Sequence, residues 1–298
     1  MPLRGVVVLA VLSLALPARA KDTIGLSVST LNNPFFVTLR DGARAAADRA
    51  GLALVVLDAQ DKADKQVSDL EDLVQKKVKV ILVNPTDAAA VVPAIQKANA
   101  AGIPVITVDR GASGGKVAFH IASDNVAGGR SAGEFACKLL GGKGKMVELE
   151  GIPGSSAARD RGKGFNDYLR ASCPGVTVVS RQTANFDRGQ GLTVMENVLQ
   201  AQPAIDAVFA HNDEMALGAL QAVKASKRPI KIVGFDATDD AVKAVKGCQL
   251  VATVAQQPSE MGRLSVEKAA ALVKGARPGD QTEFIPVALK LVTNPGCK

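Results

Sequence analysis

Polar and aromatic side chains follow many of the apolar, strand-length runs in this chain. They are Asn33, Phe35, Phe36, Asp109, Arg110, Arg161, Phe186, Asn212, Phe235, Asp236 and Gln256, with Asn84 expected near them. Carboxylates accept hydroxyl protons, guanidinium groups donate to oxygens, and amides do both. Phenyl rings cover apolar C–H faces and exclude water, which strengthens the surrounding hydrogen bonds. The set predicts a site for a small polyhydroxylated ring such as a monosaccharide.

Each of these residues also has a purely structural interpretation. Asn33, Asn212 and Asp187 could be helix caps with no role in binding. Asp109 and Arg110 could form an ion pair between domains with no role in binding. Phe35 and Phe36 are consecutive, and helix neighbours point about 100° apart, which predicts one ring in a core and the other facing something else. We favour a site because both halves of the chain provide the same residue types at the same edge.

Apolar runs of strand length alternate with amphipathic runs of helix length from Lys21 onward. The expected strands span residues 23–29, 52–58, 78–84, 103–109, 145–151, 176–180, 206–212, 230–236 and 250–256. Near-continuous apolar strands separated by helices indicate parallel sheets covered on both faces. Nine strands exceed one comfortable sheet, so we predict an α/β fold of two doubly wound domains. Ligands bind beyond the carboxyl ends of such strands, where the polar residues fall.

Three glycine-rich segments partly match enzyme motifs. "GASGG" at residues 111–115, with His211 downstream, fits a hydrolase nucleophile motif, but a strand-like run follows where a helix is required. "GGKGKM" lacks the hydroxyl residue of a phosphate-binding loop, and "GIPGSS" is not a dinucleotide fingerprint. The sequence therefore predicts no enzyme. A secreted sugar-modifying enzyme stays the remote alternative, and it would need a general acid and base.

The first 20 residues have the pattern of a secretory signal peptide. A basic start precedes an apolar run over residues 6–16, and Ala18 and Ala20 form the small-residue site, so cleavage is expected after Ala20. The run is shorter than the roughly 20 residues that span a bilayer. We therefore predict an exported protein.

Charge and cysteine content exclude some classes of function. The net charge is +7, but basic and acidic residues are interspersed, and there is no Trp and one Tyr, which argues against a nucleic-acid surface. The four cysteines suit disulfides in an oxidising compartment, and three pairings are open. Their spacing gives little support to a zinc site, so neither metal nor cofactor is expected.

Motifs along the whole chain after residue 20 resemble the periplasmic sugar-binding family of type I, whose fold is shared with lactose-repressor-type regulators. They include "STLNNPFF", "VNPTD", "IPVITVDR", "HIASDN", "GSSAARDRG", "NFDRG", "NDEMALGAL" and "VGFDAT". The resemblance implies that the eleven residues named first hold a monosaccharide. D-ribose is expected before another pentose or hexose such as allose, xylose or galactose. A repressor would need a DNA-binding segment where the signal peptide stands.

The resemblance also implies an organisation and partners. One lobe would comprise residues 21–123 and 257–288, and the other residues 124–256 and 289–298, joined by a three-segment hinge. An ABC importer in the inner membrane is the implied partner, a chemotaxis receptor is left open, and a monomer is expected. The four cysteines depart from the family pattern. All would map to the second lobe, where Cys137 with Cys173 and Cys248 with Cys297 is the pairing hypothesis.

Overall fold

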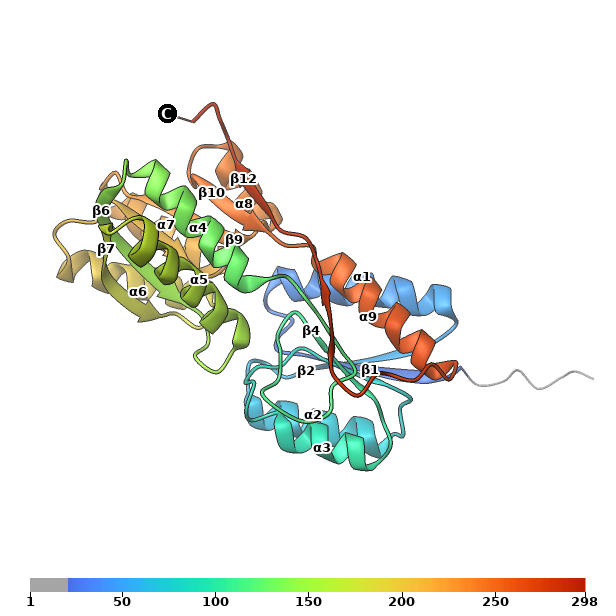
Figure 1. Ribbon diagram of the computed structural model, residues 1–298. Coiled ribbons are helices and arrows are strands. Elements are labelled where there is room, and N and C mark those ends of the chain that lie inside the picture. The colour runs from blue at the N-terminus through green and yellow to red at the C-terminus, as the bar shows by residue number, and fades with distance from the viewer. Residues whose placement is uncertain (1–20, 298) are drawn as a thin grey trace, which may run out of the picture.

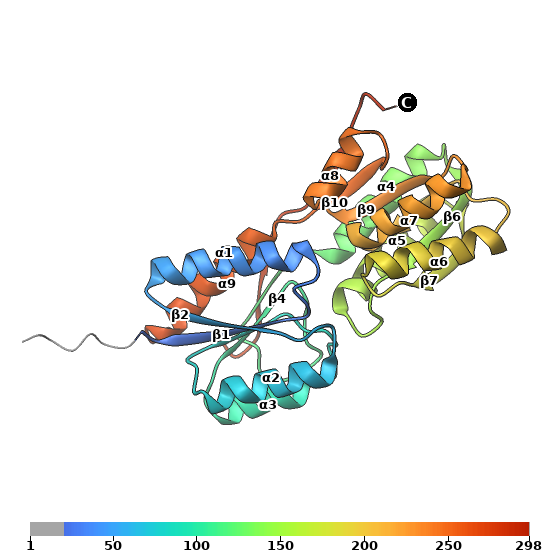
Figure 2. The same cartoon turned by 180° about the vertical axis from the view of Figure 1, so that it is seen from behind.

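The computed structural model describes residues 21–297 and has two α/β lobes, each built on a six-stranded sheet (Figures 1 and 2). The predicted fold class of two doubly wound lobes is confirmed. The signal-peptide prediction for residues 1–20 lies outside the described residues. Among the described residues, no helix is long and apolar enough to cross a membrane.

The first lobe has strand order β11-β5-β4-β3-β1-β2, and every pair of neighbours is parallel. Helices α1 and α9 pack together on one face of this sheet, and α2 and α3 cover the other (Figure 1). The elements are β1 (Thr23–Val28), α1 (Pro34–Ala50), β2 (Ala53–Asp58), α2 (Ala63–Gln75), β3 (Ile81–Val83), α3 (Val92–Ala100), β4 (Val105–Val108), β5 (Phe119–Ala122), α9 (Pro258–Val273) and β11 (Glu283–Pro286).

The second lobe repeats this plan with strand order β12-β10-β9-β8-β6-β7, in which only β12 is antiparallel to its neighbour. Here α4 pairs with α5, and α6 pairs with α7. The elements are α4 (Asn125–Leu139), β6 (Lys143–Glu150), α5 (Ser156–Ser172), β7 (Gly175–Thr183), α6 (Arg188–Ala201), β8 (Ala207–Ala210), α7 (Asp213–Ser226), β9 (Lys231–Asp236), α8 (Asp239–Lys246), β10 (Ala252–Ala255) and β12 (Lys290–Thr293).

The chain changes sheet three times: between β5 and β6, between β10 and β11, and between β11 and β12. Two of the connecting segments lie against each other, since Gln257 Nε2 donates to the Ala288 carbonyl at 3.1 Å. These changes support the predicted three-segment hinge, while its residue boundaries stay a prediction. Strands β5, β11 and β12 were absent from the nine expected strands, although the sequence has a strand-like run after residue 115, where β5 lies. Strands β11 and β12 gave no such signal. Both are four-residue, largely exposed edge strands, so they lack the apolar run that marks the others.

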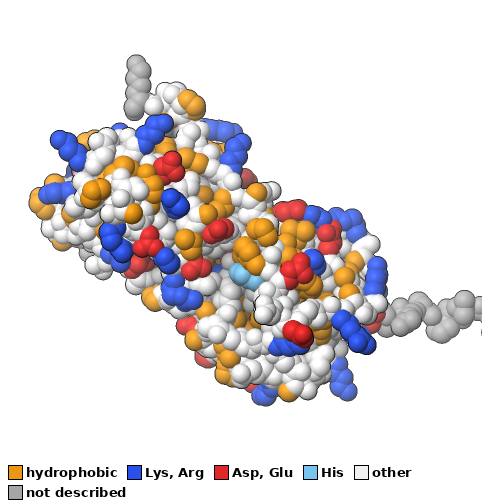
Figure 3. All heavy atoms as spheres, viewed as in Figure 1, with side chains coloured by type: hydrophobic (Ala, Val, Ile, Leu, Met, Phe, Trp, Pro, Cys, Tyr) orange, Lys and Arg blue, Asp and Glu red, His pale blue; other side chains and the backbone are white. Residues whose placement is uncertain are grey.

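Charged side chains of both signs are spread over the face of the molecule in Figure 3, and the two lobes are separated by a waist. No single basic patch dominates this face. On this face basic side chains therefore stand among acidic ones, as the interspersed sequence pattern predicted.

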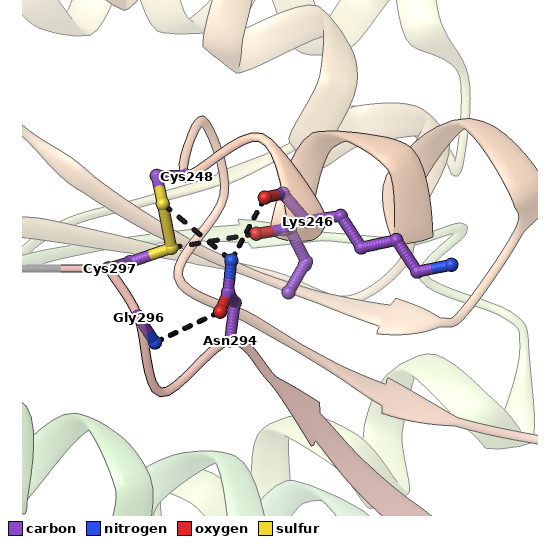
Figure 4. The surroundings of a disulfide bond; sticks show 6 residues. Lys246, Cys248, Asn294, Gly296 and Cys297 are labelled. Atoms are coloured by element: carbon purple, nitrogen blue, oxygen red, sulfur yellow. Dashed lines mark hydrogen bonds between the residues drawn. A yellow bond between two sulfur atoms is a disulfide. The ribbon is translucent and has the colours of Figure 1, made fainter.

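Two disulfides, Cys137–Cys173 and Cys248–Cys297, lie in the second lobe, which confirms the pairing hypothesis. The first joins the ends of α4 and α5. The second joins the loop after α8 to the segment after β12 (Figure 4). There Asn294 donates to the Lys246 carbonyl at 2.9 Å and accepts from the Gly296 amide at 3.0 Å. The last described residues are thus tied to the second lobe.

Replacing Cys248 and Cys297 together with serine is expected to lower the free energy of unfolding by about 2–4 kcal/mol, because the bond closes a loop in the unfolded chain. The bond spans 49 residues. Chemical denaturation monitored by circular dichroism measures the change. Ligand affinity should stay within about twofold, because neither cysteine lines the pocket described below. An unchanged midpoint of unfolding would contradict the prediction.

Candidate functional site

The carboxyl ends of the strands in both sheets meet around a narrow pocket. Its lining residues are Asn33, Phe35, Phe36, Asp109, Arg110, Ala157, Arg161, Phe186, Asn212, Asp236 and Gln256. Ten of the eleven predicted site residues are therefore brought together, and every lining residue is at most 7% exposed. The cavity left between these side chains is only about 10 Å³, about the space of one water molecule.

Phe235 is the predicted residue that does not line the pocket. It is fully buried, and the Arg161 guanidinium carbon lies 3.8 Å from the centre of its ring. A cation over an aromatic face is stabilised by the ring quadrupole. Phe235 therefore packs against Arg161 on the side away from the pocket. Side chains alternate along β9, so Asp236, the next residue, takes the pocket side.

The first lobe contributes Asp109 and Arg110 from the end of β4, with their nearest atoms 3.8 Å apart. This ion pair is local to one lobe and does not bridge the two. Asn84 lies behind it, fully buried, and donates to Asp109 Oδ2 at 3.1 Å. Ser29 accepts from Arg110 Nη1 at 2.8 Å. Both pocket side chains are thus held by a second layer of polar groups.

The aromatic residues wall the pocket from both lobes. Phe35 and Phe36 meet edge to face, with ring centres 5.2 Å apart, and both are buried. The expectation that only one of the two rings joins the core was wrong, because Phe35 and Phe36 both pack in the first-lobe core and both line the pocket. Phe186 of the second lobe lies 4.9 Å from the Arg110 guanidinium carbon.

The second lobe holds Arg161 in a fixed position. Its Nε donates to Asn125 Oδ1 at 2.8 Å, and its Nη1 donates to the His211 carbonyl at 2.5 Å. Asp236 Oδ1 lies 3.5 Å from Nη1 and accepts from Gln256 at 2.8 Å. The guanidinium is therefore oriented before any ligand arrives, which lowers the entropic cost of binding.

Two of the three predicted helix caps also line the pocket. Asn33 Oδ1 accepts from the Phe35 amide at 2.9 Å, and Asn212 Oδ1 accepts from the Met215 amide at 3.0 Å. Asp187 caps α6 in the same way but does not line the pocket. The structural interpretation therefore holds for all three residues as caps. Asn33 and Asn212 also present side chains to the pocket, because each cap sits where a strand ends and a helix begins.

Three buried polar atoms of the lining have no hydrogen-bond partner among the described residues: Asp109 Oδ1, Arg110 Nε and Gln256 Oε1. Two are acceptors and one is a donor. Leaving a buried polar group unpaired costs about 1–3 kcal/mol. A ligand that both donates and accepts around one small ring would satisfy all three. Among the described residues no cluster of potential metal ligands is present.

Comparison with known proteins bears on this arrangement. The model of a periplasmic binding protein domain matches residues 24–277. This chain belongs to the periplasmic binding protein family. The ribose import binding protein RbsB of Haemophilus influenzae is 50% identical over 282 residues, covering 95% of each chain. RbsB of Bacillus subtilis is 51% identical over 271 residues, covering 91% of this chain and 87% of its own.

A solved structure extends the comparison to the fold. The Caulobacter myo-inositol binding protein, bound to myo-inositol, superposes with a TM-score of 0.88 at 35% identity and covers 94% of this chain and 95% of its own. The two-lobed arrangement of this periplasmic binding protein is therefore shared with a relative whose structure holds a small polyhydroxylated ring.

Burial shifts the ionisation of both pocket carboxyl groups. It raises the pKa of Asp236 to about 7, against the opposing effects of the Arg161 charge and the Gln256 hydrogen bond. It also raises the pKa of Asp109, although the charges of Arg110 and Arg161 act in the other direction. Burying a carboxylate without full compensation disfavours its charged form. The charged forms of these two carboxyl groups therefore lower the stability of the folded protein, as is common for residues of functional sites.

Three lining residues adopt left-handed backbone conformations: Asp109 with φ 62°, Phe186 with φ 61° and Asp236 with φ 116°. Such conformations are strained for residues other than glycine and cluster at functional sites. Each of these residues stands where the chain leaves a strand or a loop to enter the pocket. In these backbone conformations the three side chains line the space between the lobes.

Ala157 is the lining residue that the sequence did not reveal, since a methyl group carries no chemical signal. Ser29 and Asn125, which hold the two pocket arginines, were also missed. They act through contacts between segments far apart in the chain. The position of Ser29 at the end of the first expected strand is the sequence signal that could have revealed it.

The two lobes touch directly beside the pocket. The Ala88 amide donates to the Gly154 carbonyl at 3.0 Å, and the Gly111 amide donates to Ser156 Oγ at 2.8 Å. A Cβ atom at position 154 would lie 1.9 Å from Asp87 Oδ2. A methyl group at position 154 would therefore force the Asp87 side chain to shift, although its Oδ1 accepts hydrogen bonds from the Ala89 and Ala90 amides. These bonds join the lobes without lining the pocket.

Proposed function

We propose that this protein is an exported binding protein that captures a monosaccharide, D-ribose first, between its lobes and delivers it to an ABC importer. The observation that carries the proposal is the buried pocket, which has an unpartnered donor and an unpartnered acceptor on its first-lobe side and an unpartnered acceptor, Gln256 Oε1, on the other side. The names of two relatives at 50% and 51% identity, both ribose import binding proteins, support the choice of ribose.

Binding would proceed by domain closure. A sugar that contacts Asp109 and Arg110 in one lobe and Arg161 and Asp236 in the other is stabilised only when the lobes meet. Closure also joins surface from both lobes into one face, which a membrane permease can distinguish from the open form. The periplasm is the proposed location. A monomer and a chemotaxis receptor as second partner belong to the same proposal and await direct measurement.

We infer further that the protein holds its ligand without transforming it. The relatives are named as binding proteins, and the polar groups of the pocket serve as hydrogen-bond donors and acceptors for hydroxyls. A second candidate function keeps the mechanism with a different ligand, such as another pentose or a hexose. The relative with bound myo-inositol supports this alternative, because it shows that this fold accommodates a six-membered polyol.

The deciding experiment is isothermal titration of the chain without residues 1–20, using D-ribose followed by D-allose, D-xylose and D-galactose. Saturable ribose binding at roughly micromolar affinity or tighter, about −8 kcal/mol, is expected. Asp109→Asn should abolish it, while Asp280→Asn, at an exposed position, serves as the control. Binding only to another sugar would refute the assignment of ribose as the ligand and leave the mechanism of closure intact. Binding to none of them would overturn the site.

Gly154→Ala is expected to weaken ribose binding about tenfold or more, because the added methyl group collides with Asp87 only when the lobes are closed. Titration measures the affinity, and thermal unfolding of the ligand-free variant should be unchanged. Gly247→Ala is the matched control, since its φ is −84° and its Cβ would meet an atom no nearer than 3.4 Å. Equal affinity of Gly154→Ala and wild type would refute the closed arrangement as the binding form.

A further inference from the structure

A buried ionisable pair lies behind the second-lobe side of the pocket. Glu148 on β6 and His211 after β8 are both fully buried, with Glu148 Oε1 and His211 Nε2 2.9 Å apart. Neither residue lines the pocket. Holding a carboxylate and an imidazole in a dry interior is costly unless both are well partnered, and this invites a functional explanation.

Glu148 is the centre of a polar cluster that joins four elements. Asn166 of α5 donates to both of its carboxylate oxygens, at 3.0 and 2.9 Å. Arg181 of β7, whose side chain is 48% exposed, donates to Oε2 at 2.9 Å. Burial alone would raise the pKa of Glu148, but the hydrogen bond and charge of His211, with Asn166 and Arg181, hold it below its usual value. The group is thus a carboxylate at neutral pH.

His211 connects this cluster to the pocket through its backbone. Its carbonyl accepts from Arg161 Nη1 at 2.5 Å, and the residue that follows it is Asn212. Two pocket side chains therefore depend on where the His211 peptide lies. Two contacts with the neighbouring strand β6 hold His211: its amide donates to the Leu149 carbonyl at 2.9 Å, and Glu148 holds its imidazole ring.

We propose that Glu148 and His211 form a positioning pair that sets the orientation of Arg161 and Asn212 for ligand binding. The pair touches no ligand and acts through the His211 peptide. This inference rests on the proposed function for its effect on affinity, but its effect on Arg161 exists in the second lobe alone. Every group involved, including the Asn125 partner of Arg161, belongs to that lobe.

Three variants test the pair. His211→Asn is polar but too short to reach Glu148. His211→Gln places an amide donor near the position of Nε2. The double variant Glu148→Leu/His211→Leu removes both members and leaves no unpaired buried carboxylate. In that variant Arg181 keeps Glu150 at 3.7 Å, and Asn166 keeps the Gly162 carbonyl at 2.8 Å. The double variant therefore still tests the pair if His211→Asn fails to fold.

The first measurement is the ¹⁵N-resolved NMR signal of the Arg161 Nε–H group in ligand-free protein, with thermal unfolding alongside. The signal should shift or broaden in His211→Asn and in the double variant, and return to the wild-type position in His211→Gln. The second is titration with D-ribose. His211→Asn and the double variant should bind about tenfold or more weakly, because a charge-assisted hydrogen bond of Arg161 is disturbed, and His211→Gln should bind within about threefold of wild type.

An Arg161 signal that is the same in all four proteins would overturn the inference, as would a double variant with wild-type ribose affinity. Wild-type protein that binds no ribose would refute the proposed ligand, and the Arg161 signal would then decide the positioning role by itself. If His211→Asn and His211→Gln lose the same thermal stability, and His211→Gln does not restore the Arg161 signal, the pair has a structural role only.

Discussion

Asp236→Asn is expected to weaken ribose binding by about a hundredfold or more, and to stabilise the ligand-free protein at pH 8. The affinity falls because the carboxylate accepts hydroxyl protons in charge-assisted hydrogen bonds, each of which contributes about 1.5–3 kcal/mol. Asparagine keeps the shape and an acceptor for Gln256 but not the charge. The stability rises because a buried carboxylate is replaced by a neutral amide.

The sign of the pH effect follows from the direction of the pKa shift. Asp236 has a folded-state pKa of about 7, above the value near 3.9 in an unfolded chain. Between those values the folded state binds more protons than the unfolded state, so stability falls as pH rises through this window and does not recover above it. We expect the variant to exceed wild type by about 1–3 kcal/mol at pH 8 and to match it near pH 4.

Chemical denaturation of ligand-free protein at several pH values measures this difference, and ribose titration at pH 8 measures the affinity. A slope with pH should persist in the variant, because burial also raises the pKa values of Asp109 and Asp213. Asp280→Asn is the exposed control and should change neither quantity. A variant that is less stable than wild type at pH 8 would show that Asp236 is needed to balance Arg161.

Arg110→Lys is expected to weaken ribose binding by about a hundredfold although it keeps the positive charge. The guanidinium lies between Phe36 and Phe186, with 5.1 and 4.9 Å from its carbon to the two ring centres. Its Nη1 donates to Ser29 while Nε is free for a ligand. Lysine has neither the planar group that stacks between rings nor donors in this fork, so both functions are lost.

Titration of Arg110→Lys with ribose tests this, with Arg170→Lys as the matched control because its side chain is 76% exposed. Circular dichroism should show an unchanged fold in both variants. Affinity within about threefold of wild type would mean that charge alone matters at position 110. The geometry of the guanidinium between the two rings would then not contribute to binding.

Much of this protein is determined by local sequence. The alternation of apolar runs with amphipathic helices indicated the two doubly wound lobes, because parallel strands buried on both faces must be apolar almost throughout. It also placed most of the polar residues at the carboxyl edge, since they stand at or just after the end of a strand, whereas Arg161 lies in α5. Edge strands β11 and β12 escaped this reasoning because half-exposed, four-residue strands lack the signal.

The disulfide pairing illustrates a limit of local information. Spacing left three pairings of the four cysteines open, and resemblance to the family suggested one of them. The structure supports this pairing because α4 and α5 lie side by side, which brings Cys137 to Cys173 across 36 residues. Chain folding, and not spacing, decides which thiols meet.

The sequence by itself determined which kinds of side chain reach the pocket, because residue type and place after a strand are local properties. Only the tertiary structure decided what each of them does there. It set Phe235 behind Arg161 and brought both Phe35 and Phe36 to the pocket. It also joined Glu148 to His211 across 63 residues. The physical reason is that burial, hydrogen-bond partners and pKa shifts depend on contacts between distant segments, which exist only once both sheets have formed.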